Sequence, residues 1–276
     1  MTPVTNANKA LWEQGDFTRI AATMRRSGEE LVAQLGVTRG MRVLDLGCGD
    51  GTTALPAARL GADVLGVDIA RNLVAAGNRR AAAEGLPNLR FEEGDAASLD
   101  LLADDSFDLV VSIFGAMFAP RPFDVAKEMV RVTRPGGRIV MGNWIPGDPT
   151  LVAQILKISA SYSPPAPEGF ISPVAWGLEA NVVERFGQAG IPADRIQCTR
   201  QTYTFEHEGP PSDLLAIMRT YYGPTINAYT AAESNGRTAD LHGELEELFA
   251  SQNTASTPDM TTIAATYLQV HVTVGG

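Results

Sequence analysis

Short apolar runs alternate with amphipathic segments along the first half of the chain. Runs with strand character cover residues 42–46, 63–67, 88–91, 107–114 and 137–143. Segments with helical spacing, closed by Gly or Pro, separate them. Because strands that alternate with helices build parallel β-α-β units, this pattern predicts an α/β fold around a mainly parallel sheet.

Two of these runs indicate the centre of the sheet. Residues 107–114 and 139–141 are apolar at nearly every position, as expected of strands that are buried on both faces. The segment between them is one-sided, since Ala126, Met129 and Val130 share one face of a predicted helix. We therefore predict a doubly wound, Rossmann-like sheet.

The second half of the chain changes character after Trp144. Prolines punctuate a loop-rich stretch, and helical patterns cover about 151–159 and 178–189. Residues 195–206 and 265–274 then alternate between two faces, as strands do. These two strands are expected to pair with each other. They complete a seven-stranded mixed sheet with six parallel strands and one antiparallel strand near the edge.

An insertion separates these last two strands. Residues 207–263 contain helical patterns at 212–222 and about 225–251. A segment of this length is too long for a simple hairpin loop. We predict that it forms a helical cap over the ligand crevice and selects the substrate.

The charge balance narrows the class of partner. Among 276 residues, 22 Lys and Arg stand against 32 Asp and Glu, which gives a formal net charge of -10. A protein that neutralises many phosphates needs a basic surface, and the sequence contains no basic cluster. We expect a small-molecule partner, with no nucleic acid and no membrane.

The N-terminal residues and the cysteines bear on the compartment. No uncharged apolar run approaches the roughly 18 residues of a membrane-spanning helix, and residues 1–20 lack a signal-peptide pattern. Cys48 and Cys198 form neither a disulfide framework nor a zinc-ligand spacing. Two thiols fit a reducing compartment, and we expect a cytoplasmic protein.

The most specific motif is Val-Leu-Asp-Leu-Gly-Cys-Gly-Asp-Gly at residues 43–51, between a predicted strand and a predicted helix. Its glycines let the backbone turn tightly and approach a nucleotide-like ligand. A dinucleotide fingerprint requires a glycine where this chain has Thr52, so a nicotinamide site is the less favoured alternative. A glycine-rich turn without a ligand is the other alternative.

Three further motifs follow in order along the chain. Gly-Val-Asp-Ile ends the second predicted strand with Asp68, and Glu-Gly-Asp-Ala carries Asp95 after the third. Ser-Ile-Phe-Gly at 112–115 ends the fourth. With the glycine motif, they resemble the class I S-adenosylmethionine-dependent methyltransferases, in particular the ubiquinone/menaquinone-methyltransferase-like group that acts on small molecules. The resemblance is strong over 40–144 and weak elsewhere.

The resemblance implies a site for S-adenosylmethionine, with S-adenosylhomocysteine as the product. Asp68 is expected to bind the ribose hydroxyls, Ile69 to pack on the adenine, and Asp95 to accept from the adenine amino group. As alternatives, Asp68 is a helix cap and Asp95 a turn acid. The predicted cofactor set in the core is Asp45, Gly47, Cys48, Gly49, Gly51, Asp68, Ile69, Asp95, Ala96, Ser112 and Phe114.

The segment before the glycine motif resembles the lid of many small-molecule members of this family. Trp-Glu-Gln-Gly-Asp-Phe at 12–17 carries the likeness, and Trp12 and Phe17 are expected to close over the cofactor. The predicted organisation is an N-terminal helical lid at 1–39, a methyltransferase core at 40–206 plus 264–276, and a cap at 207–263.

Missing motifs argue against related activities. Nucleobase methyltransferases usually carry an Asn/Asp-Pro-Pro-aromatic motif where this chain has Ser-Ile-Phe-Gly. No paired glutamates follow Ser112, as protein-arginine methylation would require. Metal-dependent catechol methyltransferases place acidic and amide ligands at strand ends where only Asn143 is available, and we predict no metal.

Methyl transfer from a sulfonium requires chiefly that an O, N or C nucleophile be held in line at about 3 Å with water excluded. His207 and Glu179 are the candidate general bases, with a structural role as the alternative for His207. By family analogy the acceptor is aromatic or quinone-like. A non-catalytic binder of the cofactor and a nicotinamide-dependent oxidoreductase are the alternative functions. The predicted substrate-binding residues are Trp144, Trp176, Tyr221, Tyr222 and Met117.

Overall fold

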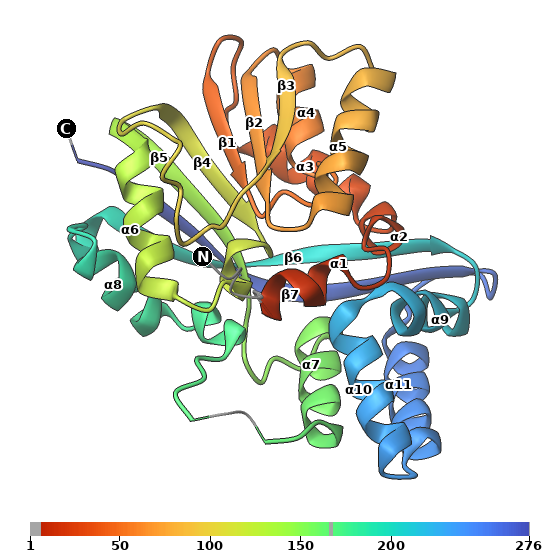
Figure 1. Cartoon of the computed structure of the whole chain (residues 1–276). Coiled ribbons are helices and arrows are strands. Elements are labelled where there is room, and N and C mark those ends of the chain that lie inside the picture. The colour runs from red at the N-terminus through yellow and green to blue at the C-terminus, as the bar shows by residue number, and fades with distance from the viewer. Residues whose placement is uncertain (1–6, 166–167, 276) are drawn as a thin grey trace, which may run out of the picture.

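The structure, a computed structural model, describes residues 7–165 and 168–275. Within this part of the chain, one sheet holds seven strands in the order β3-β2-β1-β4-β5-β7-β6 (Figure 1). Each strand overlaps a run that the sequence pattern indicates. The strands are β1 (Arg42–Leu46), β2 (Asp63–Asp68), β3 (Leu89–Glu93), β4 (Phe107–Ile113), β5 (Thr133–Trp144), β6 (Ile196–Glu208) and β7 (Met260–Thr273).

The pairing of the strands follows the predicted mixed pattern. Strands β1 to β5 pair in parallel with their neighbours, whereas β7 runs antiparallel to both β5 and β6. Strand β6 therefore points the same way as β5 and forms the edge. The prediction of a Rossmann-like α/β sheet with six parallel strands and one antiparallel strand is confirmed.

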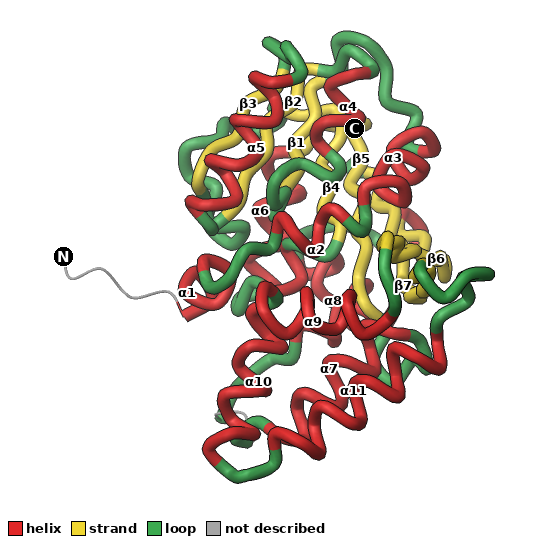
Figure 2. The backbone as a smooth tube through the Cα atoms, turned by 90° about the vertical axis from the view of Figure 1, so that its right-hand side faces the viewer, coloured by secondary structure: helices red, strands yellow, loops and turns green. Residues whose placement is uncertain are grey.

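Helices flank the sheet on two sides (Figures 1 and 2). Helices α4 (Ala54–Arg59) and α5 (Arg71–Ala83) pack on β2 and β3, and α3 (Arg25–Gln34) packs on α4. Helix α6 (Pro122–Val132) packs on β4 and β5 and against α8 (Glu179–Gln188). Single 3-10 turns occur at η1 (Ala116–Phe118), η2 (Pro173–Gly177) and η3 (Ala193–Arg195).

Helix α6 illustrates how the local sequence builds these layers. Pro122 occupies the first helical position, where its missing N–H is tolerated. Val125, Ala126, Met129 and Val132 are fully buried, which gives the one-sided helix that the apolar spacing predicts. No helix in the described part of the chain is long and apolar enough to cross a membrane.

In the described range, the predicted N-terminal lid begins with two short helices that lie between the sheet and the cap helices. Residues 7–39 of the predicted lid fall in the described range, and residues 1–6 lie outside it. Helix α1 (Ala7–Glu13) contacts α5 and the cap helix α10, and α2 (Thr18–Ala22) contacts the cap helix α9. The chain that precedes the sheet is thereby packed across the carboxyl ends of its strands (Figure 1).

The cap is a group of four helices packed together beyond the sheet (Figure 1). It comprises α7 (Leu151–Tyr162), α9 (Pro211–Tyr221), α10 (Gly223–Ser234) and α11 (Thr238–Gln252). Helix α7 precedes β6 in the chain, so it comes from outside the predicted insertion. Because β6 runs to Glu208 and β7 begins at Met260, the helical part of that insertion spans 211–252.

The single helix predicted at about 225–251 is wrong, since the chain forms α10 and α11 there. Helix α10 ends at Ser234, and Gly236 takes a φ of 66°. A glycine in this left-handed conformation terminates a helix because the chain can no longer continue the helical hydrogen-bond pattern. The apolar spacing on both sides of Gly236 hid this break.

Candidate active site

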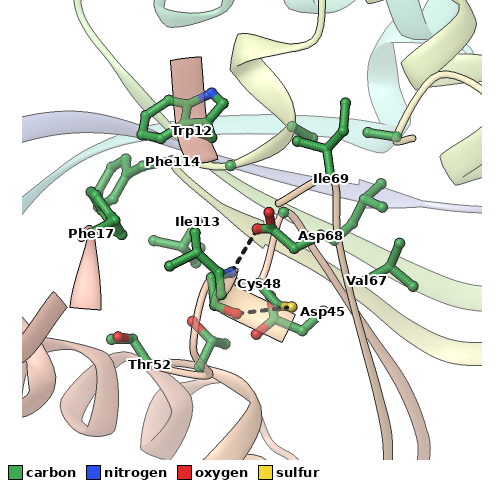
Figure 3. A pocket seen from close by; sticks show the side chains of 18 of the residues that line it. Trp12, Phe17, Asp45, Cys48, Thr52, Val67, Asp68, Ile69, Ile113 and Phe114 are labelled. Carbon is green, nitrogen blue, oxygen red and sulfur yellow. Dashed lines mark hydrogen bonds between the residues drawn. The ribbon is translucent and has the colours of Figure 1, made fainter. Parts of the chain in front are cut away.

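A first cavity opens where the carboxyl ends of β1, β2 and β4 meet (Figure 3), the edge at which open α/β sheets hold their ligands. Its volume is about 930 Å³, part of it open to solvent. The lid closes one side through Trp12 and Phe17. The predicted cofactor residues that line it are Asp45, Gly47, Cys48, Gly49, Asp68, Ile69, Asp95, Ala96, Phe114, Trp12 and Phe17.

Two glycines of the 43–51 motif serve packing within the protein. A Cβ on Gly47 would lie 2.6 Å from the Cα of Gly115, so this glycine lets the loops after β1 and β4 touch. A Cβ on Gly51 would overlap Cδ1 of Leu55 and lie 2.7 Å from the ring of Phe91. Gly51 was predicted to border the cofactor, but it does not line the cavity. Leu55 and Phe91 occupy the space that a side chain would need.

Gly49 and Asp68 form a rigid part of the cavity wall. A Cβ on Gly49 would find Phe17 as its nearest neighbour at 4.0 Å, so the backbone there is open to the cavity. The N–H of Gly49 donates to Oδ2 of Asp68 at 2.8 Å (Figure 3), and the N–H of Ala70 donates to Oδ1 at 2.9 Å. Burial raises the pKa of Asp68, and these N–H groups oppose the shift. Asp68 therefore orders the glycine loop while it borders the cavity.

Asp45 places a second buried carboxyl group in the wall. It is 2% exposed, and its Oδ2 has no hydrogen-bond partner among the described residues. Burial, followed by the nearby charge of Asp68, raises the pKa of Asp45 to about 8. A buried carboxyl oxygen without a partner fits a cationic or hydrogen-bond-donating group of a ligand. Burial also raises the pKa of Cys48, which keeps this thiol protonated and fits a packing role.

Asp95, Ala96 and Ile69 border the cavity from the loops after β3 and β2. Oδ1 of Asp95 accepts the N–H of Ala97 at 2.9 Å, which is the turn role considered as its alternative. Oδ2 of Asp95 lies 3.8 Å from a guanidinium nitrogen of Arg121. These contacts hold a partly exposed carboxylate at the rim, where it can still accept a hydrogen bond from a ligand.

Aromatic and ionic contacts tie the lid to the core. The rings of Trp12 and Phe17 meet edge to face, with centroids 5.6 Å apart. Arg25 pairs with Asp50 of the glycine loop, whose side chain is 3% exposed. Arg80 of α5 lies 3.6 Å from the same carboxylate. A buried carboxylate shared by two guanidinium groups thus connects the lid, the glycine loop and α5.

A second cavity of about 390 Å³ adjoins the first. The two share Trp12, Phe17, Met24 and Phe114 as lining residues. Two of the predicted substrate residues, Trp144 and Tyr222, line the second cavity. Its remaining lining residues are Ile20, Phe118, Val152, Ile155, Phe205 and Met218.

Phe114 stands between the two cavities. It follows β4 with a φ of 58°, a left-handed conformation that is uncommon outside glycine. Its ring stacks on Trp144 with centroids 3.6 Å apart, and it meets Tyr203 and Tyr267 edge-on at 5.1 and 5.2 Å. This aromatic packing holds the strained backbone in place, so the partition between the cavities has a defined position.

Ser112 and Met117 line neither cavity, contrary to their predicted roles. The Ser112 hydroxyl donates to the carbonyl of Leu46 at 2.5 Å and accepts the N–H of Ala116 at 2.9 Å. These two bonds fix the loop after β4 against β1 and so position Phe114. Met117 is 1% exposed and belongs to the core.

Four other predicted residues lie away from both cavities. Glu179 is the exposed first residue of α8, and His207 lies opposite Thr261 near the end of β6. Trp176 is 1% exposed and packs beneath Arg185, 4.4 Å from its ring centroid. The fourth, Tyr221, ends α9. The structure therefore does not bring the candidate bases His207 and Glu179 to the crevice.

Strand β6 contributes two site residues that the sequence analysis missed. Tyr203 lines the first cavity, and Phe205 lines the second. Both are 2% exposed, and they share one face of the strand because they are two residues apart. Burial raises the pKa of Tyr203 well above its usual range, so its hydroxyl stays protonated. The alternation along 195–206 was the signal that could have identified this pair.

In the described ranges, no three or more His, Cys, Asp and Glu side chains cluster so as to hold a metal ion. Asn143, the amide considered as a ligand, is fully buried, and its side-chain N and O atoms have no partner there. The absence of a metal stays a prediction.

Known proteins share this architecture and sequence pattern. A family profile described as a methyltransferase domain matches residues 44–141. An uncharacterised protein of Mycobacterium bovis, Mb1438c, is 36% identical over 246 residues, which cover 87% of this chain and 86% of that protein. A demethylmenaquinone methyltransferase of Renibacterium salmoninarum is 38% identical over 120 residues, or 44% of this chain and 48% of that relative.

A solved structure shows the same fold. Phosphoethanolamine N-methyltransferase 2 of Haemonchus contortus, in complex with phosphomonomethylethanolamine and S-adenosylhomocysteine, superposes with a TM-score of 0.57 at 16% identity. The match covers 91% of this chain and 53% of that one. The seven-stranded sheet, the strand-end cavity and these sequence matches agree: the chain belongs to the class I S-adenosylmethionine-dependent methyltransferases.

Proposed function

We propose that this protein transfers the methyl group of S-adenosylmethionine to a small-molecule acceptor. The observation that carries the proposal is the pairing of two adjoining cavities, one walled by the glycine loop and buried carboxyl groups, the other apolar. Phe114 lies on their common boundary. A donor in the first cavity and an acceptor in the second would face each other across this residue.

The first cavity suits the parts of the donor molecule. Asp68 accepts from the ribose hydroxyls with the lone pairs that Gly49 and Ala70 leave free. Ile69 packs on the adenine, and Asp95 accepts from the adenine amino group. The partnerless Oδ2 of Asp45 accepts from the ammonium group of the methionine part.

The chemistry is supplied by the sulfonium, whose S–C bond breaks as the methyl carbon bonds to an O, N or C nucleophile, so that the sulfur keeps the electron pair. The protein's part is to hold the nucleophile in line and to exclude water. Trp12 and Phe17 line both cavities and shield part of each from water. His207 and Glu179 border neither cavity, so the proposal gives neither of them the proton of the attacking atom, which leaves to solvent.

The acceptor is proposed to be aromatic or quinone-like. The relative from Renibacterium salmoninarum is named as a demethylmenaquinone methyltransferase, and the apolar second cavity offers no site for an extended polymer. The net charge of -10 argues against nucleic acid as the acceptor. The two free cysteines support a reducing, cytoplasmic location.

Parallel calorimetric titrations with S-adenosylmethionine, S-adenosylhomocysteine and NAD test this proposal. We expect dissociation constants on the order of micromolar for the first two and no measurable heat for NAD. Binding of NAD alone would reject the donor assignment in favour of the oxidoreductase alternative. Release of S-adenosylhomocysteine in the presence of an acceptor then separates an enzyme from a non-catalytic binder.

A further inference from the structure

The second cavity is enclosed by parts of the chain that lie far apart in the sequence. The N-terminal segment contributes Trp12, Phe17, Ile20 and Met24, and the sheet with the turn after β4 contributes Phe114, Phe118, Trp144 and Phe205. The cap contributes Val152 and Ile155 of α7, Met218 of α9 and Tyr222, which follows α9. The space between these residues is about 390 Å³, part of it open to solvent. Because segments from three parts of the chain surround it, a compact ligand suits this space better than an extended chain.

The lining of this cavity carries no charge. Among the described residues that line it, none is Asp, Glu, Lys, Arg or His. A charged ligand would lose its hydration without gaining an ion pair, at a cost of several kcal/mol. The cavity therefore favours a ligand that is neutral over the whole part that enters it.

One hydroxyl group interrupts the apolar lining. Tyr222 lies between α9 and α10 and lines the cavity, and among the described lining residues it alone carries a hydroxyl group. Burial raises the pKa of Tyr222 well above its usual range, so this group stays protonated and can donate. A tyrosine hydroxyl in apolar surroundings usually has a hydrogen-bond partner, and a ligand in this cavity would supply one.

Aromatic rings determine the shape that fits. The stacked pair of Phe114 and Trp144 forms one wall, with planes 10° apart. Trp12 and Phe118 also line the cavity, and their rings meet at 71° with centroids 4.9 Å apart. A flat ring inserted among these faces and edges gains aromatic contacts that an aliphatic chain does not.

We propose that the second cavity binds a neutral, planar aromatic acceptor whose polar substituent accepts a hydrogen bond from the Tyr222 hydroxyl. This inference rests on the proposed function for the identity of the neighbouring ligand. It goes beyond that function because it assigns the acceptor subsite to named residues and excludes acceptors with a charged ring substituent, such as ring carboxylates and ring phosphates.

Calorimetric titration of the full chain, saturated with S-adenosylhomocysteine, tests the inference with two matched probes. 2-Naphthol is flat and neutral, and 2-naphthoate has the same rings with a carboxylate. We expect one molecule of 2-naphthol to bind and 2-naphthoate to bind at least about tenfold more weakly. Equal affinities for the two probes would overturn the inference.

Cavity-filling variants test whether 2-naphthol binds in the second cavity. Val152→Phe, on α7, fills the cavity and should weaken 2-naphthol by at least about tenfold, with S-adenosylhomocysteine affinity within about twofold of the parent. Leu156→Phe enlarges a residue of the same helix that lines neither cavity, and it should leave both affinities unchanged. If Val152→Phe does not fold, Met218→Trp on α9 makes the same test. Unchanged 2-naphthol affinity in a folded cavity-filling variant would refute the assignment.

Tyr222→Phe tests the hydrogen bond separately. It should weaken 2-naphthol by about fivefold and leave naphthalene, which has no hydroxyl, unaffected; equal changes for the two probes would reject the role of the hydroxyl. If S-adenosylhomocysteine does not bind at all, the proposed function fails. The comparison of 2-naphthol with 2-naphthoate on the free protein then still decides the present inference.

Discussion

The lining residues of the two cavities are distributed differently along the sequence. The first takes most of its polar wall from three short segments within 45–53, 67–69 and 94–96, each at or just after the end of a parallel strand. The second takes its lining from residues scattered between Trp12 and Tyr222. A strand end thus forms a cofactor site from a few adjacent residues, whereas an acceptor site arises only when distant apolar faces pack together.

The cavities also differ in charge. Asp45, Asp50, Asp68 and Asp95 all border the first, and the described residues around the second include no ionisable side chain other than Tyr222. A molecule that carries a cation and many hydrogen-bond donors fits the first cavity, and a neutral ring fits the second. Substitutions in and around the first cavity should therefore change donor affinity, stability or the pH dependence of stability. They should not change the preference of the second cavity for neutral acceptors.

The largest effect is expected from Gly51→Ala. The new Cβ would press on Leu55 and Phe91 at a φ of 93°, and the free energy of unfolding should fall by about 3 kcal/mol. Gly49→Ala is the matched control, because its Cβ would point into the cavity; it should lower stability by about 1 kcal/mol while it weakens S-adenosylhomocysteine. Urea unfolding and calorimetry measure both quantities. Greater instability in Gly49→Ala than in Gly51→Ala would contradict this assignment of the two glycines.

Asp68→Ala should have the next largest effect, on donor affinity. Loss of an ionised acceptor from the ribose and from the Gly49 N–H should weaken S-adenosylhomocysteine by about 100-fold, or roughly 3 kcal/mol. Asp63→Ala removes an exposed carboxylate from the other end of the same strand and should leave the affinity unchanged. Calorimetry on folded protein makes the measurement. An affinity within about twofold of the parent would reject the ribose assignment.

Asp45→Asn should change how stability depends on pH. The pKa of Asp45 in the folded protein is raised to about 8, so the folded state keeps a proton that the unfolded chain loses above about pH 4. Stability then falls as the pH rises through this window, by at most about 1.4 kcal/mol per pH unit from this group. Asparagine should flatten that slope in urea unfolding, whereas Asp63→Asn should not. An identical slope in Asp45→Asn and the parent would count against the raised pKa.

The smallest effect is expected from Arg25→Met, which detaches the lid from Asp50. Arg80 remains near that carboxylate, and the Arg25 side chain is 25% exposed, so the loss of unfolding free energy should be only about 1 kcal/mol. The affinity for S-adenosylhomocysteine should fall about threefold. Arg26→Met, at a side chain that is 71% exposed, is the control. Indistinguishable results for the two variants would show that the Arg25–Asp50 ion pair does not hold the lid on the core.

Sequence patterns predicted the sheet and the strand-end residues well, because both follow from short-range regularities. Asp68 and Gly49 lie where the motif places them, on the cavity wall. Gly51 and Ser112 belong to the same motifs but do not line the cavity. A motif indicates that a position is constrained, but it does not distinguish a ligand from a neighbouring side chain or carbonyl as the cause. Leu55 and Phe91 constrain Gly51, and the carbonyl of Leu46 holds Ser112.

The acceptor side was harder to predict for a different physical reason. The alternation along β6 shows that Tyr203 and Phe205 share a face, but only the packed fold shows that this face meets the crevice. Val152 contributes from α7, which lies outside the predicted insertion. The aromatic character of Trp144 and Trp176 is the same in sequence, yet one borders a cavity and the other is buried beneath Arg185. Which of these residues border a cavity depends on contacts between segments that are far apart in the sequence.

The central claim is that a donor and a neutral aromatic acceptor occupy adjoining cavities on either side of Phe114. Interligand nuclear Overhauser effects in a solution of the protein with S-adenosylhomocysteine and 2-naphthol test it directly. The account predicts simultaneous binding and magnetisation transfer between the two ligands, lost in Val152→Phe. Displacement of one ligand by the other, or joint binding without any transfer between them, would contradict the claim.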